Sequence, residues 1–165
     1  MNAVNLSSEI ETVSRLLIAK KLTIAFAESA TAGSAAASFS LACDAGKFLK
    51  GGVVCYDARL KCDLLGVPDN MLKEYTPESM EVTRAIAHGL AKLIEADIHI
   101  GITGLPCSGG SETTEKPVGT MFVVAVRQGE ELFAVRKQFS GTHTDILQQT
   151  SQYLAAALLK IIGDP

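Results

Sequence analysis

The stretch LTIAFAESATAGSAAASFSL, residues 22–41, decides the fold. It begins with an apolar run from Leu22 to Ala27, which is short enough to be a buried strand. From Thr31 to Leu41 alanine and serine dominate, and this composition suits a helix that packs closely against a sheet. Residues 44–46, Asp-Ala-Gly, predict the end of this helix. A buried strand that passes directly into a helix is typical of an α/β protein.

Helix and strand patterns continue to alternate on both sides of this stretch. Before it, residues 8–11 have the spacing of a capping box, and apolar residues at helical intervals predict a first helix that ends near Lys20. The apolar positions are Leu6, Ile10, Val13 and Leu17. After it, residues 51–56 predict a second strand, and residues 57–65 predict a short helix closed by Gly66.

The second half of the chain follows the same pattern and ends in a hairpin and a helix. Residues 76–78, Thr-Pro-Glu, have the hydroxyl, proline and acid that favour a helix start. Residues 97–102 predict a further strand. Two strands over residues 120–127 and 132–139 flank a turn at residues 128–130, which predicts an antiparallel pair. A last helix is expected from about Thr144 to Ile161.

Together these elements predict a three-layer α/β/α sandwich with a mixed, mostly parallel sheet. Helices between buried strands imply right-handed crossovers, and the hairpin adds the antiparallel part. The length predicts a single domain over residues 1–165. Ligands in such sheets bind beyond the carboxyl ends of the parallel strands. We therefore expect residues 28–33, 56–61 and 103–116 to meet at one crevice.

Composition and charge exclude several classes of protein. With 47% hydrophobic and 20% charged residues, the chain is not disordered, collagen-like or a coiled coil. The net charge of −3 and the lack of a basic run argue against nucleic-acid binding. Neither a signal peptide nor a stretch that could span a bilayer is seen, so a cytoplasmic protein without membrane contact is expected. The four cysteines and three histidines lack metal-ligand spacing, so no metal is predicted.

Polar residues follow the first buried strand directly, at Ser29 and Thr31. Two hydroxyls beside the free backbone N–H groups of a helix start can bind an anion or stabilise an oxyanion. Either residue is also an ordinary helix N-cap, which needs no ligand. Both interpretations stay open on the sequence alone.

Tyr56 and Lys61 lie five residues apart, across a strand end and the helix that follows. A lysine in a dry pocket has a lowered pKa and can act as general base toward a serine hydroxyl, with a tyrosine relaying a proton. The alternative is a solvated lysine beside a tyrosine at the rim of the sheet.

Residues 103–117 form a long, glycine-rich loop, and loops of this length are often functional. Its glycines allow close approach of a ligand, and its N–H groups can hold a phosphate or carboxylate. The loop matches neither the Walker A pattern nor the dinucleotide-binding glycine pattern, and it can also be a plain surface loop. Cys107 is a nucleophile only if an activating neighbour lies beside it.

A set of motifs in fixed order resembles the family of CinA C-terminal domains over nearly the whole chain. The motifs are Glu28-Ser29-x-Thr31-x-Gly33, Gly52-x-Val54-x-Tyr56-x4-Lys61, Leu65-Gly66-Val67, Ser79, Thr103-Gly104, Gly109-Gly110-Ser111-Glu112 and Glu115-Lys116-Pro117-Val118-Gly119-Thr120. The family includes nicotinamide mononucleotide deamidases, which are amidohydrolases that release ammonia and leave nicotinate mononucleotide. The resemblance implies this activity, without a cofactor, on a small nucleotide or amide substrate.

The resemblance also implies roles for individual residues. Ser29 is implied as the nucleophile, Lys61 as its general base, and Tyr56 as a proton-relay or orienting group. The implied substrate-binding residues are Glu28, Thr31, Gly33, Thr103, Gly104, Gly109 and Gly110. Helix-start N–H groups between Ala30 and Gly33 are expected to stabilise the oxyanion.

The sequence departs from the family pattern around this site. Ala30 and Ala32 replace a cysteine and a glycine, and Ala32 is unfavourable if its backbone needs a positive φ. The segments 57–60 and 105–108 also differ, while His143 and Leu147 stand where the family has arginines that can bind a phosphate. The alternative to an amidohydrolase is therefore a catalytically inactive paralogue that binds a nucleotide or a partner protein. A homo-oligomer is expected only because homo-oligomers are common among soluble proteins.

Overall fold

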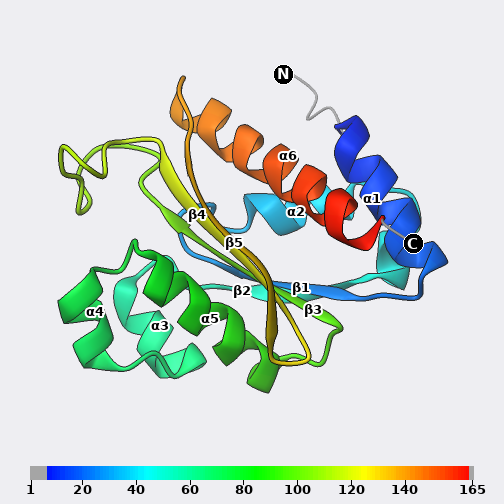
Figure 1. The fold of residues 1–165 in the computed structure, drawn as a ribbon, viewed down its shortest axis with the longest axis horizontal. Helices are drawn as coiled ribbons and strands as arrows, with labels where there is room; N and C mark the ends of the chain where they lie inside the picture. Colours follow the sequence, from blue (N-terminus) through cyan, green and yellow to red (C-terminus); the bar gives the residue numbers. More distant parts are fainter. Residues whose placement is uncertain (1–6, 164–165) are drawn as a thin grey trace.

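The computed structural model describes residues 7–163, which are built around a five-stranded mixed sheet (Figure 1). The strands lie in the order β2-β1-β3-β4-β5. Their bounds are Ile24–Glu28 for β1, Leu49–Val54 for β2, Ile98–Gly104 for β3, Thr120–Arg127 for β4 and Glu130–Gln138 for β5. β1 pairs in parallel with β2 and β3, whereas the β3–β4 and β4–β5 pairs are antiparallel. The mixed sheet is confirmed, with parallel pairing confined to its β2-β1-β3 half.

Helices cover both faces of the sheet, so the predicted α/β/α sandwich is confirmed (Figure 1). One face carries α1, α2 and α6, and the other carries α3, α4 and α5. The bounds are Ser8–Ala19 for α1, Ser34–Ser40 for α2, Ala58–Leu65 for α3, Asp69–Tyr75 for α4, Met80–Leu93 for α5 and His143–Ile162 for α6. A short 3₁₀ turn, Ala45–Lys47, precedes β2.

β1 lies in the middle of both hydrophobic cores, and its sequence explains why. Successive side chains of a strand point to opposite faces. Ile24 and Phe26 accordingly pack in the core under α1, α2 and α6, whereas Ala25 and Ala27 belong to the core under α5. All five residues of β1 are buried. The carboxyl end of β1 is thus held in place by packing on both faces. The position of the residues that follow it is fixed by this packing.

Two predicted helix starts are wrong, because a neighbouring serine caps the helix instead. Ser7 accepts the N–H of Ile10 and so caps α1, whereas the predicted capping box began at Ser8; Leu6 lies outside the described residues. Ser79 caps α5 by accepting the N–H of Val82, and the predicted cap, Thr76, stays outside the helix.

Other boundaries shift by a few residues. Residues 31–33 form a turn, so α2 begins later than predicted, and α4 was not expected from the sequence. Strand β1 extends to Glu28, β2 begins and ends two residues earlier than predicted, and β3 continues through Gly104. The hairpin of β4 and β5 is confirmed, with β5 slightly earlier than expected.

Candidate active site

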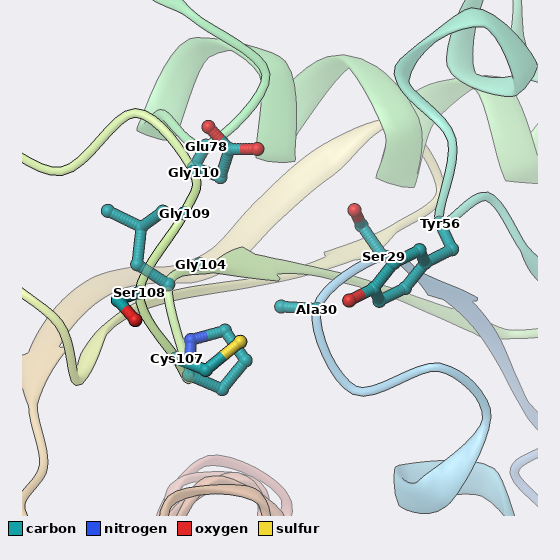
Figure 2. A pocket seen from close by; sticks show the side chains of 11 residues that line it. Ser29, Ala30, Tyr56, Glu78, Gly104, Cys107, Ser108, Gly109 and Gly110 are labelled. Atoms are coloured by element: carbon teal, nitrogen blue, oxygen red, sulfur yellow. The ribbon is translucent and has the colours of Figure 1, made fainter. Parts of the chain in front are cut away.

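A pocket of about 240 Å³ opens beyond the carboxyl ends of β1 and β3 (Figure 2). Its lining residues are Ser29, Ala30, Tyr56, Glu78, Gly104, Leu105, Pro106, Cys107, Ser108, Gly109 and Gly110. All three segments expected at the crevice contribute to it. The structure therefore brings together Ser29, Tyr56 and the glycines of the loop after β3, as the rule for α/β sheets predicts.

Ser29 is the first residue after β1, and its backbone is fixed by two hydrogen bonds. Its N–H donates to the carbonyl of Ile102 on β3 at 3.0 Å, and its carbonyl accepts the N–H of Ala32 at 3.1 Å. The side chain lines the pocket in Figure 2. Within residues 7–163 its hydroxyl has no hydrogen-bond partner. The hydroxyl is therefore available to a ligand.

Glu28 directs its carboxylate into the start of α2. One carboxylate oxygen accepts the N–H groups of Gly33 at 2.9 Å and Ala35 at 3.1 Å, and the other accepts that of Ala36 at 2.8 Å. Only 1% of the residue is exposed, and a buried carboxylate is tolerated when such donors satisfy it. The contact is structural, and the substrate-binding role of Glu28 stays a prediction.

The turn at residues 30–33 leaves few donors free for an oxyanion. Gly33 donates to Glu28 and Ala32 donates to Ser29, so within residues 7–163 only the N–H groups of Ala30 and Thr31 lack an acceptor in this turn. Ala32 has φ +48° and Gly33 has φ +94°. Ala32 therefore has the left-handed backbone that favours glycine. The expectation that alanine is unfavourable at this position applies, because its φ is positive.

The side chain of Thr31 points into the protein. The residue is 1% exposed, and its hydroxyl oxygen is buried without a hydrogen-bond partner in the described residues. Thr31 is not among the residues that line the pocket. A direct side-chain contact with substrate stays a prediction.

Tyr56 stands at the pocket mouth, just after β2. It is 59% exposed, and it lines the pocket together with Ser29, across from Cys107 and Ser108 in Figure 2. Its neighbour Cys55 donates its backbone N–H to the carbonyl of Glu28 at 2.8 Å. This pairing joins the two strand ends that Ser29 and Tyr56 follow.

Lys61 is buried, and the alternative of a solvated lysine is therefore wrong. It is 1% exposed on α3, and its Nζ donates to the carbonyl of Cys55 at 3.2 Å. Burial lowers the pKa of its ammonium below the ordinary value. No hydrogen bond joins Lys61 to Ser29 or Tyr56 in residues 7–163, but its head group is held beside the Cys55-Tyr56 peptide.

Thr103 and Gly104 end β3 but face different ways. The hydroxyl of Thr103 is buried and lies 2.7 Å from that of Thr83 on α5, so this side chain fastens the helix to the sheet. Gly104 lines the pocket. A Cβ there would lie 2.4 Å from the sulfur of Met121 and 2.6 Å from the carbonyl oxygen of Thr120, so only glycine fits.

Gly109 and Gly110 line the opposite wall, in the loop between β3 and β4. The N–H of Gly109 donates to the carboxylate of Glu112 at 2.8 Å. Backbone donors, that of Gly109 first, lower the pKa of Glu112. The N–H group expected to hold a ligand anion is thus engaged by the chain's own exposed carboxylate.

Lys116 ties the same loop to the segment before α5. Its Nζ donates to the hydroxyl of Thr76 at 2.7 Å, to the hydroxyl of Ser111 at 2.8 Å and to the carbonyl of Glu78 at 2.9 Å. Ser111 in turn donates to the carboxylate of Glu78 at 2.5 Å. Burial lowers the pKa of Lys116. This network holds the loop wall of the pocket in place.

Sequence reasoning missed Glu78 as a pocket residue. It is the one charged residue among those that line the pocket, and it was placed only in the first turn of a helix. Its position depends on where α5 meets the loop, and no local pattern carries that information. Cys107 also lines the pocket, but it has no activating hydrogen-bond partner within residues 7–163.

Other candidate features lie away from the pocket. His143 is exposed at the start of α6, and Leu147 lines a separate groove between α2 and α6. His99 is a buried structural residue whose Nε2 lies 2.8 Å from the carbonyl of Ile94.

In the part of the chain that the structure describes, no three His, Cys, Asp or Glu side chains are grouped to hold a metal. No helix in residues 7–163 has the length and apolar character needed to cross a bilayer.

Known proteins of similar sequence are CinA-like. The chain is 36% identical over 150 residues to a CinA-like protein from Thermotoga neapolitana, covering 91% of this chain and 36% of that protein. It is 32% identical over 142 residues to a CinA-like protein from Desulfotalea psychrophila, covering 86% and 34%. The chain therefore spans about a third of the length of these curated relatives.

Solved structures agree with the sequence matches. A competence damage-inducible protein A from Klebsiella pneumoniae superposes with a TM-score of 0.90 at 27% identity, covering 96% of this chain and 98% of that one. A competence-damaged protein (CinA) superfamily protein from Escherichia coli gives 0.86 at 28% identity, covering 97% and 92%. The family model for the CinA C-terminal domain matches residues 7–162 of the sequence. The chain thus belongs to the family of CinA C-terminal domains.

Proposed function

We propose that the pocket hydrolyses a carboxamide, by the reaction that converts nicotinamide mononucleotide and water into nicotinate mononucleotide and ammonia. The observation that carries this proposal is the free hydroxyl of Ser29 in the pocket, close to two unengaged backbone N–H groups. An amide is a poor electrophile, so its hydrolysis needs an activated nucleophile, donors for the oxyanion and an acid for the departing ammonia. The residues around Ser29 can supply each of these.

Ser29 attacks the carboxamide carbon in this mechanism, and neutral Lys61 receives its proton. Burial favours the neutral amine, because desolvation penalises the charged form. An ammonium has three donors, and within residues 7–163 that of Lys61 has one acceptor, the carbonyl of Cys55. In this mechanism the lone pair of the amine takes up the Ser29 proton, and the ammonium that forms keeps its bond to Cys55.

The N–H groups of Ala30 and Thr31 stabilise the negative charge that develops on the amide oxygen. The N–H of the residue after a nucleophilic serine is a common oxyanion donor, because the tight turn places it beside the hydroxyl. Here Glu28 and Ser29 engage the next donors of the turn and fix its shape. The donor pair is therefore held in place before a substrate arrives.

Tyr56 carries the proton to the leaving group in this mechanism. It lines the same pocket as Ser29 (Figure 2). Collapse of the tetrahedral adduct breaks the C–N bond, and a proton that originates on Ser29 passes through Lys61 and Tyr56 to release ammonia. Water then attacks the acyl-serine, gives one proton back through the same groups, and frees the carboxylic acid and Ser29.

Ammonia release from nicotinamide mononucleotide by the purified protein tests the proposal. We expect release by the wild type and loss of at least about 1,000-fold in Ser29→Ala and Lys61→Ala, because nucleophile and base act as a unit. Ser40→Ala is the matched control, since Ser40 is exposed on α2 and outside the pocket. Undiminished release in Ser29→Ala would reject the mechanism. No release from any carboxamide by folded protein would favour a paralogue that only binds a nucleotide or partner.

A further inference from the structure

Lys61 is a buried amine that has no direct ion pair. Only 1% of the residue is exposed, and its Nζ donates to the carbonyl of Cys55 at 3.2 Å. In residues 7–163 it forms no salt bridge with a carboxylate. The proposed mechanism gives this amine the proton of Ser29, so a positive charge forms at a place from which water is largely excluded. Such a charge is costly unless an opposite charge lies near it.

Four ionisable side chains act on Lys61 through space, in addition to the effect of its burial. They are Cys55, Glu78, Asp57 and Cys62. Burial raises the pKa of both thiols, so the two cysteines are uncharged near neutral pH. Of the two carboxylates, that of Asp57 is exposed at the start of α3, where water weakens its field. Glu78 is partly buried, so its negative charge acts on Lys61 through a less polar medium.

The carboxylate of Glu78 lines the pocket and is held in place from the loop (Figure 2). One of its oxygens accepts the hydroxyl of Ser111 at 2.5 Å. The same hydroxyl accepts a hydrogen bond from Lys116 at 2.8 Å, so Lys116 is linked to the carboxylate through Ser111. In residues 7–163 the other carboxylate oxygen has no hydrogen-bond partner, and Glu78 forms no salt bridge. A fixed negative charge thus stands in the wall of the pocket.

We infer that Glu78 is a positioning residue for the proton transfer, and that its carboxylate stabilises the ammonium that Lys61 becomes when it takes the proton of Ser29. The inference rests on the proposed amide hydrolysis and adds a residue to its machinery. The O–H bond of Ser29 breaks and an N–H bond forms at Nζ, while the oxygen keeps the electron pair that attacks the carboxamide carbon. Glu78 lowers the free energy of the cation formed in this step, and without it Lys61 is a weaker base.

Titration of Lys61 itself tests the pairing without a substrate. In protein that carries isotopically labelled lysine, the Cε signal of Lys61 is the one absent from Lys61→Met, and its chemical shift is followed against pH by NMR. Glu78→Gln keeps an acceptor for Ser111 and loses the charge. We expect this variant to lower the midpoint of the Lys61 titration by about 0.5–1 pH unit. An unchanged midpoint overturns the inference.

Glu81→Gln is the matched control for this titration. It removes the same charge from the first turn of α5, but Glu81 is exposed and is not one of the side chains that act on Lys61. The midpoint of Lys61 should therefore stay where it is in the wild type. An equal shift in Glu81→Gln overturns the role given to Glu78, because any loss of negative charge would then have the same effect.

The pH dependence of ammonia release from nicotinamide mononucleotide shows whether the pairing serves the reaction. The acid limb of kcat/KM reports the base of the free enzyme. In Glu78→Gln we expect this limb to move to lower pH together with the Lys61 midpoint. The rate above the limb should fall about threefold to tenfold, because a weaker base takes the Ser29 proton less readily. A lower rate with an unmoved limb is the mark of a merely structural role and overturns the inference.

The two readouts separate this inference from the proposed function. An unmoved Lys61 midpoint with ammonia release intact overturns the role of Glu78 and leaves amide hydrolysis standing. A lowered midpoint in folded protein that hydrolyses no carboxamide rejects the hydrolysis and keeps the pairing of Glu78 with Lys61.

Discussion

Two carboxylates accept backbone N–H groups on opposite sides of the pocket, and they differ in almost every other respect. Glu28 is buried and accepts three N–H groups at the start of α2, whereas Glu112 is exposed and accepts that of Gly109 in the loop. A buried anion loses more when its donors are removed than one that water can solvate. The Ser29 wall thus depends on a buried anion, and the turn at Gly109 depends on one that water can solvate.

Replacement of the buried carboxylate should give the largest effect on stability. Glu28→Gln keeps the shape but turns an N–H donor toward other donors, and we expect a loss of about 2–4 kcal/mol in the free energy of unfolding. Glu112→Gln should leave the urea midpoint unchanged, since its carboxylate is exposed. Urea denaturation of both variants checks this. Similar losses in the two would remove the distinction between the walls.

The buried amine of Lys61 gives the next largest effect on stability, seen as a pH dependence. The pKa of Lys61 is lowered in the folded state, so between that value and 10.5 the unfolded chain binds more protons. The free energy of unfolding should therefore rise with pH in this window, and Lys61→Met should flatten the rise. Denaturation at a series of pH values measures both slopes, and identical slopes would show that Lys61 is not desolvated.

Loosening the loop wall should cost less stability but change substrate binding. Lys116→Met removes three hydrogen bonds from a partly buried network, and we expect a loss of about 1–2 kcal/mol in the free energy of unfolding. KM should rise several-fold while kcat changes little, because Lys116 positions the loop and does not touch the reacting atoms. Lys92→Met, on the exposed face of α5, is the control. A loss of kcat with unchanged KM would contradict the positioning role.

The smallest expected effect is a gain, in the turn after Ser29. Ala32 has φ +48°, so Ala32→Gly should stabilise the protein by about 0.5–1 kcal/mol by relieving left-handed strain. Ala37→Gly, inside α2, should instead destabilise it by about 1 kcal/mol. Thermal denaturation of the pair checks the opposite signs. Destabilisation by both would show that the turn is not strained.

Much of the fold follows from patterns that lie within a few residues of each other. The run at residues 22–27 predicted β1, an interior strand of the sheet, and the strand ends then predicted where the pocket lies. Helix starts were harder, because Ser7 and Ser8, or Thr76 and Ser79, offer equivalent hydroxyls in sequence. Thr76 receives a bond from Lys116, forty residues away, and local sequence cannot show this.

The site shows the same division between local and distant information. Ser29 and Tyr56 could be predicted because each follows a strand whose end meets the crevice. The burial of Lys61 and the presence of Glu78 in the pocket could not, since both depend on how α3 and α5 pack against the sheet. Glu28 and Glu112 take up donors that appear free in the sequence. Those contacts leave fewer backbone donors to a ligand than the sequence suggests.

Partitioning with hydroxylamine tests the covalent role of Ser29 most directly. Hydroxylamine attacks an acyl-serine in place of water and gives the hydroxamate, whereas a mechanism without an acyl-enzyme gives only the acid. With a pyridinium carboxamide as substrate, we predict hydroxamate formed at the expense of acid by the wild type, and neither product from Ser29→Ala. Ammonia release with acid as the sole product, undiminished in Ser29→Ala, would contradict the account.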